Sequence, residues 1–499
     1  MPAEPELWNN LGLLHLAWND LAAAEQHFRR ALALRPAFAA AHSNLGIALS
    51  DQSRTTEAVQ SFHQAIAIAP GLLAARENLA RLLTRQMEDV AAVAAWDEVL
   101  GLEPGHAEAH AAKGILRMRA GLFDEARALF ARARELGMNT PAIALHEALV
   151  EAAVGDPLAA RRSLMSLRGQ AEDAELDWNL ALIHLSCGEF AEGWRLYEAR
   201  LRRSFESPRR WYPFAPWTGG ALGAGALLVM AEQGLGDEVM FASCYPDVLE
   251  LAPRCVIECD PRLAGLFARS FPDASVIGVP RDNDRRWLDR YPELRCQVHA
   301  GSLAGWFRTR VERFPRRAGY LRPDPQRVET WANRLSGLGG GLKIGIAWSG
   351  GLVHTRRALR SIPLQQLATL LRDSEHAFVS LQHDDDGSEA GRLAEVSGHT
   401  VHVFADALKD LDETAALLRS LDVVLTVCSS LAHLSGAVGA TTWVLTPRVA
   451  EWRYLRTGDT LPWYPSVRLF RQAQQGEWTP VVAEIAARLS ALPAQRKSL

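Results

Sequence analysis

The fold of the first part of this chain is decided by residues 8–36, WNNLGLLHLAWNDLAAAEQHFRRALALRP. Six residue types in this stretch recur 34 residues later. In the first copy they are Leu11, Gly12, Ala24, Phe28, Ala31 and Pro36, and in the second they are Leu45, Gly46, Ala58, Phe62, Ala65 and Pro70. Weaker copies follow at about the same spacing, and the last retains Leu180, Ala181, Gly193 and Tyr197. A fixed period of this length indicates stacked helical pairs in which small residues allow the helices to cross closely.

The period and its residue types resemble the tetratricopeptide repeat, in which each copy is a pair of helices. The resemblance implies a superhelix whose concave surface binds a peptide or another protein. About six copies fit into residues 1–205, which exceeds the roughly three copies that a stacked array needs for stability. We therefore expect residues 1–205 to recruit a protein partner and the chemistry to lie later in the chain.

Composition narrows the possible classes of protein. The chain has 499 residues, 48% hydrophobic and 22% charged, as in ordinary globular proteins of about three domains. Its net charge of −4 weighs against a nucleic-acid partner, which would require a basic face. We expect no secretory signal and no membrane span, and hence a cytoplasmic protein with reduced cysteines. Cys255 and Cys259 form an isolated pair, so no zinc site is expected.

Short apolar strands alternate with helices after residue 205. Within residues 206–340 we expect strands at 226–231, 255–258 and 275–279, with a glycine-bearing turn at 232–239 and a helix at 239–251. Within residues 341–499 we expect strands at 343–348, 377–381, 422–427 and 442–445. The alternation predicts two Rossmann-like, doubly wound parallel sheets, whose ligands bind at the carboxyl ends of the strands. Two facing units of this kind place a ligand in the cleft between them.

Three motifs follow one another in this second part: Gln233-Gly-Leu-Gly-Asp237, Arg360-Ser-Ile-Pro-Leu364 and Cys428-Ser-Ser-Leu-Ala-His433-Leu-Ser-Gly-Ala437. Their order resembles GT-B glycosyltransferases of the bacterial heptosyltransferase type. With repeats ahead of them, the layout is similar to protein glycosyltransferases such as the O-linked N-acetylglucosamine transferases and bacterial flagellin glycosyltransferases. The resemblance implies a GT-B fold, a nucleotide-sugar donor and an inverting transfer to a protein acceptor, without a metal or other cofactor.

The sequence allows two roles for Asp237. It follows the first expected strand of the sheet region, and in the resembled enzymes the matching aspartate is the proposed general base for the acceptor hydroxyl. It equally suits a helix N-cap, because aspartate is strongly favoured there.

The donor site is expected mainly in the second sheet unit. Cys428, Ser429 and Ser430 end a strand and open a helix, where backbone N–H groups favour a phosphate. His433 lies one turn further and is a candidate for assisting the leaving group, although a lone helical histidine is usually structural. Arg360 is the expected phosphate contact, with Arg356 and Arg357 as alternatives. The complete set of candidate donor-binding residues is Gly234, Gly236, Ser349, Arg360, Gln382, Cys428, Ser429, Ser430 and His433.

Two other groups of residues have simpler explanations. Residues 384–386 are three consecutive aspartates before Gly387, and we interpret them as a polar turn and not as a metal site, since hard cations require several further oxygen ligands. Trp452, Trp463 and Tyr464 can stack a base or sugar, but we interpret them as packing residues. Cys428 departs from the resembled pattern, which has aspartate there, and we do not interpret it as a nucleophile.

The expected function is therefore a glycosyltransferase that modifies a protein recruited by the repeats, with Asp237 as base and His433 assisting. By resemblance alone, flagellin and a CMP-linked nonulosonic acid form one acceptor and donor pair. Two alternatives remain open. One is an interaction scaffold whose transferase part has decayed, and the other is a heptosyltransferase-like enzyme that modifies a glycan.

Overall fold

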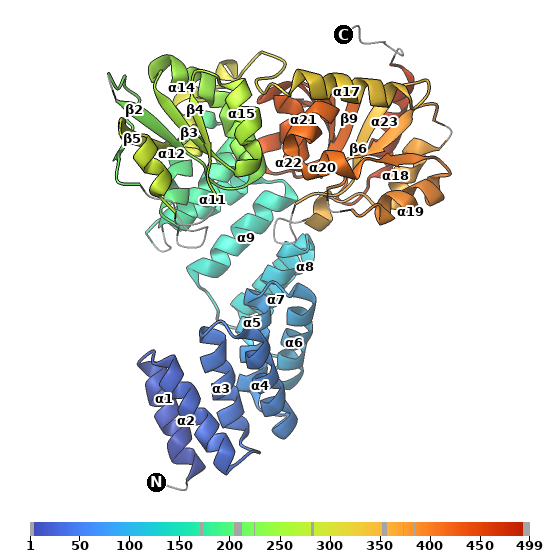
Figure 1. Ribbon diagram of the computed structural model, residues 1–499. Helices are drawn as coiled ribbons and strands as arrows, with labels where there is room; N and C mark the ends of the chain where they lie inside the picture. The colour runs from blue at the N-terminus through green and yellow to red at the C-terminus, as the bar shows by residue number, and fades with distance from the viewer. Residues whose placement is uncertain are drawn as a thin grey trace. The chain divides into compact units, whose positions relative to one another are not determined.

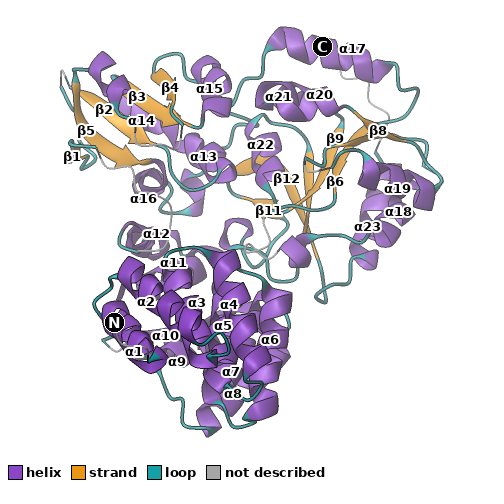
Figure 2. Ribbon diagram, turned by 60° about the horizontal axis from the view of Figure 1, so that its bottom comes forward, coloured by secondary structure: helices purple, strands orange, loops and turns teal. Residues whose placement is uncertain are grey.

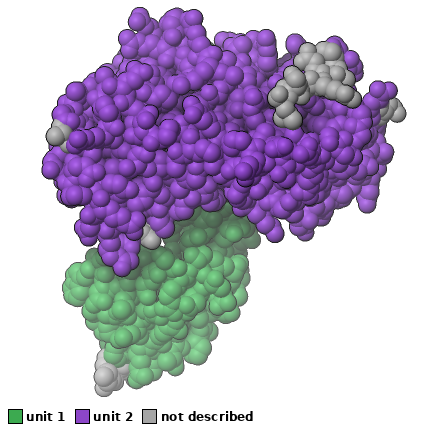
Figure 3. Space-filling model, turned by 45° about the horizontal axis from the view of Figure 1, so that its top comes forward, with its two compact units in different colours: residues 1–163 green, residues 164–499 purple. Residues whose placement is uncertain are grey.

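The computed structural model describes residues 4–169, 173–203, 212–223, 225–280, 284–351, 357–372, 374–383 and 385–492. The chain divides into two compact units, residues 1–163 and 164–499, coloured separately in Figure 3. None of the helices within the described ranges combines the length and apolar composition needed to cross a membrane.

The first unit is built of consecutive antiparallel helices (Figure 1). They are α1 (Pro5–Ala17), α2 (Leu21–Leu34), α3 (Ala39–Asp51), α4 (Thr55–Ile68), α5 (Leu73–Arg85), α6 (Asp89–Leu102), α7 (Ala107–Arg119), α8 (Phe123–Glu135), α9 (Pro141–Val154) and the start of α10 (Pro157–Ser166). The helices pair as the 34-residue period predicts, two to each copy, so the predicted helical repeats are confirmed.

The glycine and phenylalanine of each strong copy form one contact. A Cβ placed on Gly12 would lie 2.5 Å from the Phe28 ring, and one on Gly46 would lie 2.6 Å from the Phe62 ring. Phe28 and Phe62 are themselves fully buried. The repeated glycine is therefore a packing requirement, because the phenylalanine ring on the second helix fills the space that a side chain on the first helix would need.

The last helical pair belongs to the second unit. It consists of α11 (Asp173–Ser186) and α12 (Phe190–Tyr197), continued by a 3-10 turn over Glu198–Leu201. Trp194 donates its indole N–H to the carbonyl oxygen of Arg308 at 2.9 Å, and its ring contacts Phe241, Trp452 and Trp463. The division at residue 163 thus differs from the boundary predicted at residue 205, because this pair packs into the core of the sheet region.

The first sheet of the second unit is entirely parallel, with strand order β1-β5-β2-β3-β4. Its strands are β1 (Ala215–Pro216), β2 (Ala226–Met230), β3 (Cys255–Cys259), β4 (Ser275–Gly278) and β5 (Leu294–His299). The strands predicted at 226–231, 255–258 and 275–279 are β2, β3 and β4. Successive strands run outward from β2 to β4, and β5 then joins the other side of β2. The ends of β2 and β5 therefore form a topological switch point.

The helix predicted at 239–251 is wrong in its start and its continuity. The helix α13 (Leu235–Phe241) already begins inside the glycine motif, with Gly234 as its N-cap, and a 3-10 turn at Ala242–Cys244 separates it from α14 (Tyr245–Leu251). Pro246 lies in the first turn of α14, where the missing N–H is tolerated, but it cannot continue a preceding helix. The helices α15 (Ala264–Ser270) and α16 (Leu303–Phe307) complete this layer.

The second sheet has the order β11-β12-β10-β9-β6-β7-β8, and all its pairs are parallel except β11 with β12. Figure 2 shows its strands in orange. Its strands are β6 (Lys343–Ala347), β7 (Ala377–Ser380), β8 (Val401–Val403), β9 (Val423–Val427), β10 (Thr442–Thr446), β11 (Thr460–Leu461) and β12 (Tyr464–Arg471). The four predicted strands are β6, β7, β9 and β10, and all five residues of β9 and of β10 are buried. Burial on both faces explains their continuous apolar runs. The switch point lies between β6 and β9.

Helices flank this sheet. They are α17 (Pro325–Ser336), α18 (Leu364–Leu371), α19 (Ser388–Ser397), α20 (Ala405–Lys409), α21 (Leu411–Ser420), α22 (Ser430–Ala437) and α23 (Thr479–Ser490). The chain is thus a tetratricopeptide-type helical array followed by two parallel α/β sheets.

Candidate functional site

The loops that leave the two switch points pack directly against each other. The loop after β2 leads into α13, the loop after β9 leads into α22, and these two helices are in contact. A Cβ on Gly236 would lie 3.2 Å from Cα of Ser430 and 3.3 Å from Cδ2 of His433. The glycine motif and the Cys428–Ala437 motif are therefore brought together, and Gly236 allows the two helices to approach closely.

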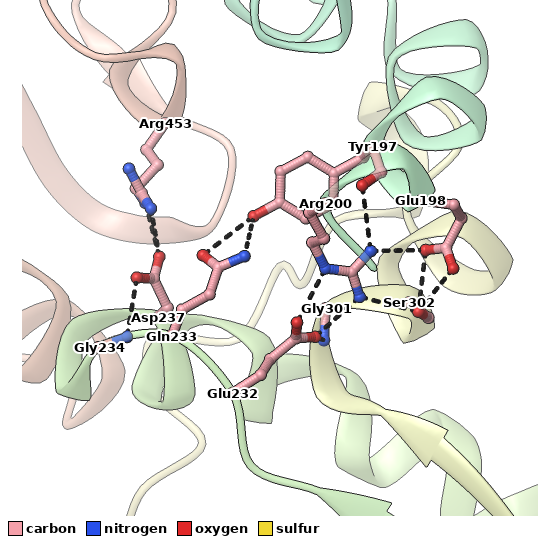
Figure 4. Close-up of polar contacts among 10 residues, drawn as sticks. All are labelled: Tyr197, Glu198, Arg200, Glu232, Gln233, Gly234, Asp237, Gly301, Ser302 and Arg453. Atoms are coloured by element: carbon pink, nitrogen blue, oxygen red, sulfur yellow. Dashed lines mark hydrogen bonds and ion pairs between the residues drawn. The ribbon is translucent and has the colours of Figure 1, made fainter. Parts of the chain in front are cut away.

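Asp237 lies in the first turn of α13, but it is not the N-cap residue. One carboxylate oxygen accepts a long hydrogen bond of 3.4 Å from the backbone N–H of Gly234, which is the N-cap. The other oxygen accepts from Arg453, whose Nε lies 2.8 Å away (Figure 4). The side chains of Asp237 and Arg453 are only 15% and 16% exposed. Asp237 therefore has both a helix-terminal contact and a charged partner from the second sheet region.

Arg453 is the second of four alternating charges, which we call the charge chain: Asp237, Arg453, Glu451 and Arg360. Arg453 Nη1 lies 3.1 Å from one oxygen of Glu451, and Arg360 Nη1 lies 2.6 Å from the other. Burial disfavours the charge on Arg453, but the carboxylates of Asp237 and Glu451 outweigh burial and hold the pKa of Arg453 above its ordinary value. The charge chain ties the first sheet's switch-point loop to the second sheet's.

Arg360 lies inside the protein and not on an open loop. It is 6% exposed and donates from Nη1 to the carbonyl oxygen of Cys428 at 3.1 Å as well as to Glu451. Arg357 donates to the hydroxyl of Ser349 at 3.2 Å, and Arg356 lies outside the described residues. The predicted phosphate contact of Arg360 therefore competes with an internal carboxylate, whereas Arg357 already reaches the loop after β6.

His433 is buried on α22 and its Nδ1 is 3.1 Å from the Tyr464 hydroxyl. Burial, with a smaller effect of the Arg453 charge, lowers the pKa of His433 to about 3. At neutral pH the ring is uncharged, so it can take part in the site only as a neutral hydrogen-bond donor or acceptor. Tyr464, Trp452 and Trp463 are buried, which confirms that they are packing residues.

Gln382 fixes the loop at the end of β6. Its side-chain oxygen accepts from the N–H groups of Trp348 and Ser349 at 3.2 and 3.1 Å. Its amide donates to the carbonyl and hydroxyl oxygens of Ser349 at 3.2 and 2.9 Å. Both ends of the Gln382 side chain are thus occupied by the protein, and the structure gives it a positioning role for Ser349.

The end of β9 carries the other predicted donor residues. Ser429 is the N-cap of α22 and its hydroxyl lies 3.3 Å from that of Thr426, while Ser430 is exposed in the first turn. A Cβ on Gly350 would lie 2.6 Å from Cβ of Ser429, so the loop after β6 passes directly over this helix start. Cys428 is fully buried, and burial raises the pKa of its thiol well above its ordinary value.

A second set of contacts holds the loop that precedes Asp237 (Figure 4). Arg200 donates to both oxygens of Glu232, each at 2.8 Å. The Tyr197 hydroxyl lies 2.8 Å from Nε2 and 3.1 Å from Oε1 of Gln233, whose φ of 62° is in the left-handed region. Burial opposes the charge on Glu232, but the guanidinium outweighs it and holds the pKa of Glu232 below its ordinary value. Residues of the last helical pair thus position the candidate catalytic loop.

A pocket of about 450 Å³ opens at the switch point of the first sheet. Met230 and His299, the last residues of β2 and β5, line it together with Trp217 and Trp306, whose ring centroids are 5.8 Å apart. Gln297 also lines it, and the buried side-chain oxygen of Gln297 accepts no hydrogen bond from any described residue. The sequence prediction missed this pocket, because β5 and the short β1 had not been recognised.

Two aspartates of the 384–386 run begin α19. Asp385 accepts from the N–H groups of Glu389 and Ala390, each at 2.9 Å, and Asp386 accepts from the N–H of Ser388 at 3.0 Å. Asp384 lies outside the described residues. Sequence reasoning also missed Arg453 and Glu451, since the late segment around them was noted only for its aromatic residues.

Comparison with known proteins identifies the first part of the chain. Residues 4–72 and 91–141 match one tetratricopeptide-repeat family model, and residues 41–105 match another. Residues 4–141 are tetratricopeptide repeats. Solved structures similar to the repeats include a tetratricopeptide repeat protein from Parabacteroides merdae (22% identity, 41% of this chain and 81% of that one, TM-score 0.37). Another is the protein TTC0263 from Thermus thermophilus (22% identity, 36% and 99%, TM-score 0.30).

One curated relative extends beyond the repeats. Protein FlbA of Caulobacter vibrioides is 34% identical over 356 residues, which is 68% of this chain and 58% of FlbA. The matched region therefore spans less than two thirds of the length of FlbA. An alignment of this length does not fit into the repeats alone, so the likeness to FlbA includes part of the sheet region.

Proposed function

We propose that this chain is a cytoplasmic protein glycosyltransferase that takes sugar from a nucleotide-sugar donor and transfers it to a protein held by the repeats. The observation that carries the proposal is the meeting of two switch-point loops, one bearing Asp237 and the other bearing Ser429 and Ser430. Switch points are where open parallel sheets bind ligands. The repeats supply a surface for a protein acceptor.

In the proposed reaction an acceptor hydroxyl oxygen attacks the anomeric carbon of the donor sugar. The bond from that carbon to the nucleotide phosphate oxygen breaks, and the phosphate leaves with the bonding electrons. The hydroxyl proton passes to the Asp237 oxygen that, among the described residues, receives only the long contact from Gly234. The first turn of α22, with Ser429 and Ser430, stabilises the charge on the leaving phosphate. No step of this reaction uses a metal ion.

Arg453 has a positioning role in this proposal. It binds the Asp237 oxygen opposite to the one that takes the proton, and thereby fixes the orientation of the carboxylate. Arg357, which already contacts Ser349 beside the start of α22, is a better phosphate ligand than Arg360, whose Nη1 is held by Glu451 and Cys428. The pocket beside Trp217 and Trp306 provides the space for an acceptor segment in the first sheet region.

Thermal-shift screening of the full chain with nucleoside mono- and diphosphates tests the donor half of the proposal, because a ligand at 100 times its Kd stabilises by about 2.7 kcal/mol. Intact-mass measurement of candidate acceptor proteins incubated with the chain and nucleotide sugars tests the transfer. A mass increase equal to one sugar residue, absent with Asp237→Asn, is the expected result. Failure of every nucleotide to bind would contradict the proposal.

A second function is favoured by the internal pairing of the predicted catalytic groups. Asp237 and Arg360 are bound within the charge chain, His433 is buried and Cys428 stands where the resembled enzymes have aspartate. A chain with these features also suits a scaffold that binds proteins without transferring sugar. Calorimetric titration with nucleotides separates the two functions, since the scaffold predicts no heat of binding.

A further inference from the structure

The pocket at the end of the first sheet is walled mainly by apolar side chains. Its volume of about 450 Å³ lies within the range of ligand-binding pockets. Pro216, Met230 and Val298 line it beside Trp217 and Trp306. Trp306 remains 44% exposed, although an indole normally buries most of its surface. A concave site therefore holds a large apolar surface that is still accessible to a ligand.

The Trp306 ring has a fixed place in this pocket. A Cβ on Gly219, whose φ of 88° is in the left-handed region, would lie 2.5 Å from the ring, so the backbone passes directly against it. The ring of Trp217, with its centroid 5.8 Å from that of Trp306, belongs to a residue that is only 5% exposed. Walls that are already ordered lose little entropy when a ligand binds.

The hydrogen-bond donors around the pocket are already used within the protein. Trp194 and Trp217 each donate their indole N–H to a backbone carbonyl oxygen, at 2.9 and 2.8 Å. The amide nitrogen of Gln297 donates to two backbone carbonyl oxygens, at 2.8 and 2.7 Å, and the Ser302 hydroxyl donates to Glu198 at 2.8 Å. A sugar ring or a phosphate requires several donors, and these groups leave none for it. The chemistry of these walls thus favours an apolar ligand group.

The pocket adjoins the loop that carries the candidate base. Met230, the last residue of β2, lines the pocket, and the loop to Asp237 begins at the next residue. Glu198 lines the other side, and Arg200 binds both Glu198 and Glu232 of that loop (Figure 4). A group bound in the pocket therefore lies beside the residues that hold the candidate catalytic loop.

The last helical pair supplies one wall of the pocket. Ala191 and Trp194 of α12 line it, opposite the strand ends of the first sheet. This helix ends the series of helical pairs whose earlier members are tetratricopeptide repeats, and such repeats bind proteins. The pocket is thus formed jointly by the last helical pair and by the sheet that leads to Asp237. This position favours a polypeptide as the source of the apolar group.

We propose that this pocket is a subsite for one aromatic side chain of the protein acceptor, close in sequence to the residue that receives the sugar. The two indoles favour an aromatic ring, because aromatic pairs gain energy from edge-to-face and offset contacts. A single large side chain in a preformed pocket is also the usual anchor of a protein interface. The inference rests on the proposed transfer to a protein, but occupation of the pocket can be measured without any transfer.

Fluorine NMR of the full chain with N-acetyl-4-fluoro-L-phenylalaninamide measures this occupation, because the probe carries the side chain without an acceptor protein. The fluorine signal is expected to broaden, with a Kd on the order of 1–10 mM for so small a ligand. N-acetyl-L-phenylalaninamide is expected to displace the probe. N-acetyl-L-serinamide and glucose at the same concentration are expected to leave it bound.

Gly305→Leu fills the pocket from its edge. Gly305 lines the pocket, and a Cβ there would meet only Trp194, at an ordinary distance of 3.7 Å, so the variant is expected to fold. It is expected to weaken binding of the probe at least about tenfold. The matched control is Gly391→Leu, at an exposed glycine of α19 where a Cβ meets no atom within 4 Å. Near-UV circular dichroism equal to that of the wild type shows that both variants are folded.

An unchanged fluorine signal with the wild-type chain overturns the proposal, and so does a Gly305→Leu variant that binds the probe like the wild type. In transfer assays Gly305→Leu is expected to raise the KM for the acceptor protein about tenfold while the Kd for nucleotide stays the same. An unchanged KM overturns the assignment of the pocket to the acceptor. Absence of nucleotide binding by the wild type contradicts the proposed function instead, whether or not the probe binds.

Discussion

Arg453 is the residue on which the candidate site depends most. It lies 216 positions from Asp237 in the sequence, yet the two side chains form an ion pair that is largely removed from water. The same guanidinium reaches Glu451 and lies near the imidazole of His433, whose pKa it helps to lower. One side chain thus sets the charge environment of both predicted catalytic residues.

Asp237→Asn is expected to reduce turnover by about 10²–10⁴-fold, because asparagine keeps the shape but cannot accept the hydroxyl proton. Nucleotide affinity is expected to stay within about twofold, since Asp237 does not contact the proposed phosphate site. Steady-state kinetics and calorimetry measure the two quantities. Full activity of Asp237→Asn contradicts a role as base.

Arg453→Gln tests whether Arg453 positions the carboxylate of Asp237. It leaves the Asp237 carboxylate in place but removes its charged partner, so we expect reduced turnover together with a changed pH profile of turnover. Rescue by Arg453→Lys is expected to be partial, because lysine lacks the fork of donors that contacts Asp237 and Glu451 at once. A pH profile of Arg453→Gln identical to that of the wild type argues against positioning of Asp237.

The lowered pKa of His433 predicts how the free energy of unfolding depends on pH. Its pKa is about 3 in the folded chain and about 6.5 when unfolded, so the unfolded state binds more protons between these values. The stability contributed by neutral His433 is therefore complete above pH 6.5 and is lost as the pH falls, by at most about 1.4 kcal/mol per pH unit. Urea unfolding of wild type and His433→Gln between about pH 7 and 4 measures it. The variant is expected to show the smaller decrease, and equal slopes contradict the assignment.

At the scale of elements, the repeat helices are determined by pairs such as Gly46 and Phe62. Gly46→Ala places a Cβ 2.6 Å from the Phe62 ring and is expected to destabilise the array by about 1–3 kcal/mol through overpacking. Gly71→Ala is the matched control, because a Cβ there meets no described atom within 4 Å. Chemical unfolding of the full chain followed by far-UV circular dichroism measures both. Equal midpoints of the two variants contradict the packing explanation.

At the scale of the whole molecule, the chain divides into compact units at residue 163. Removing residues 1–163 is expected to leave a folded unit that binds nucleotide but no longer modifies a protein acceptor, since the recruiting repeats are lost. Removing residues 1–205 takes away Trp194, Tyr197 and Arg200 as well. Glu232 then remains without its charged partner, a loss that typically costs about 3–5 kcal/mol for a buried pair.

Thermal unfolding of the two truncated chains distinguishes these outcomes. The chain of residues 164–499 is expected to show one cooperative transition with near-UV circular dichroism from its tryptophans, while the chain of residues 206–499 is expected to aggregate or to melt at a lower temperature. Equal melting of the two rejects a structural role for the last helical pair. Modification of the acceptor at full rate by the chain of residues 164–499 rejects recruitment by the repeats.

The helical repeats and most of the parallel strands could be predicted from the amino-acid sequence. Periodic features such as Gly12 with Phe28 result from packing between segments that are close in the sequence. Continuous apolar runs such as that of β9 result from burial on both faces of the sheet. Both patterns can therefore be recognised in the sequence. The sequence also placed Asp237, Ser429 and Ser430 at or just after strand ends, but their meeting depends on the strand orders and on the packing of α13 against α22. Three features became known from the folded chain alone: the last helical pair belongs to the sheet region, Arg360 is turned inward to Glu451, and Arg453 contacts Asp237. These contacts join residues tens to hundreds of positions apart, and an isolated arginine or glutamate carries no periodic signal that identifies its partner.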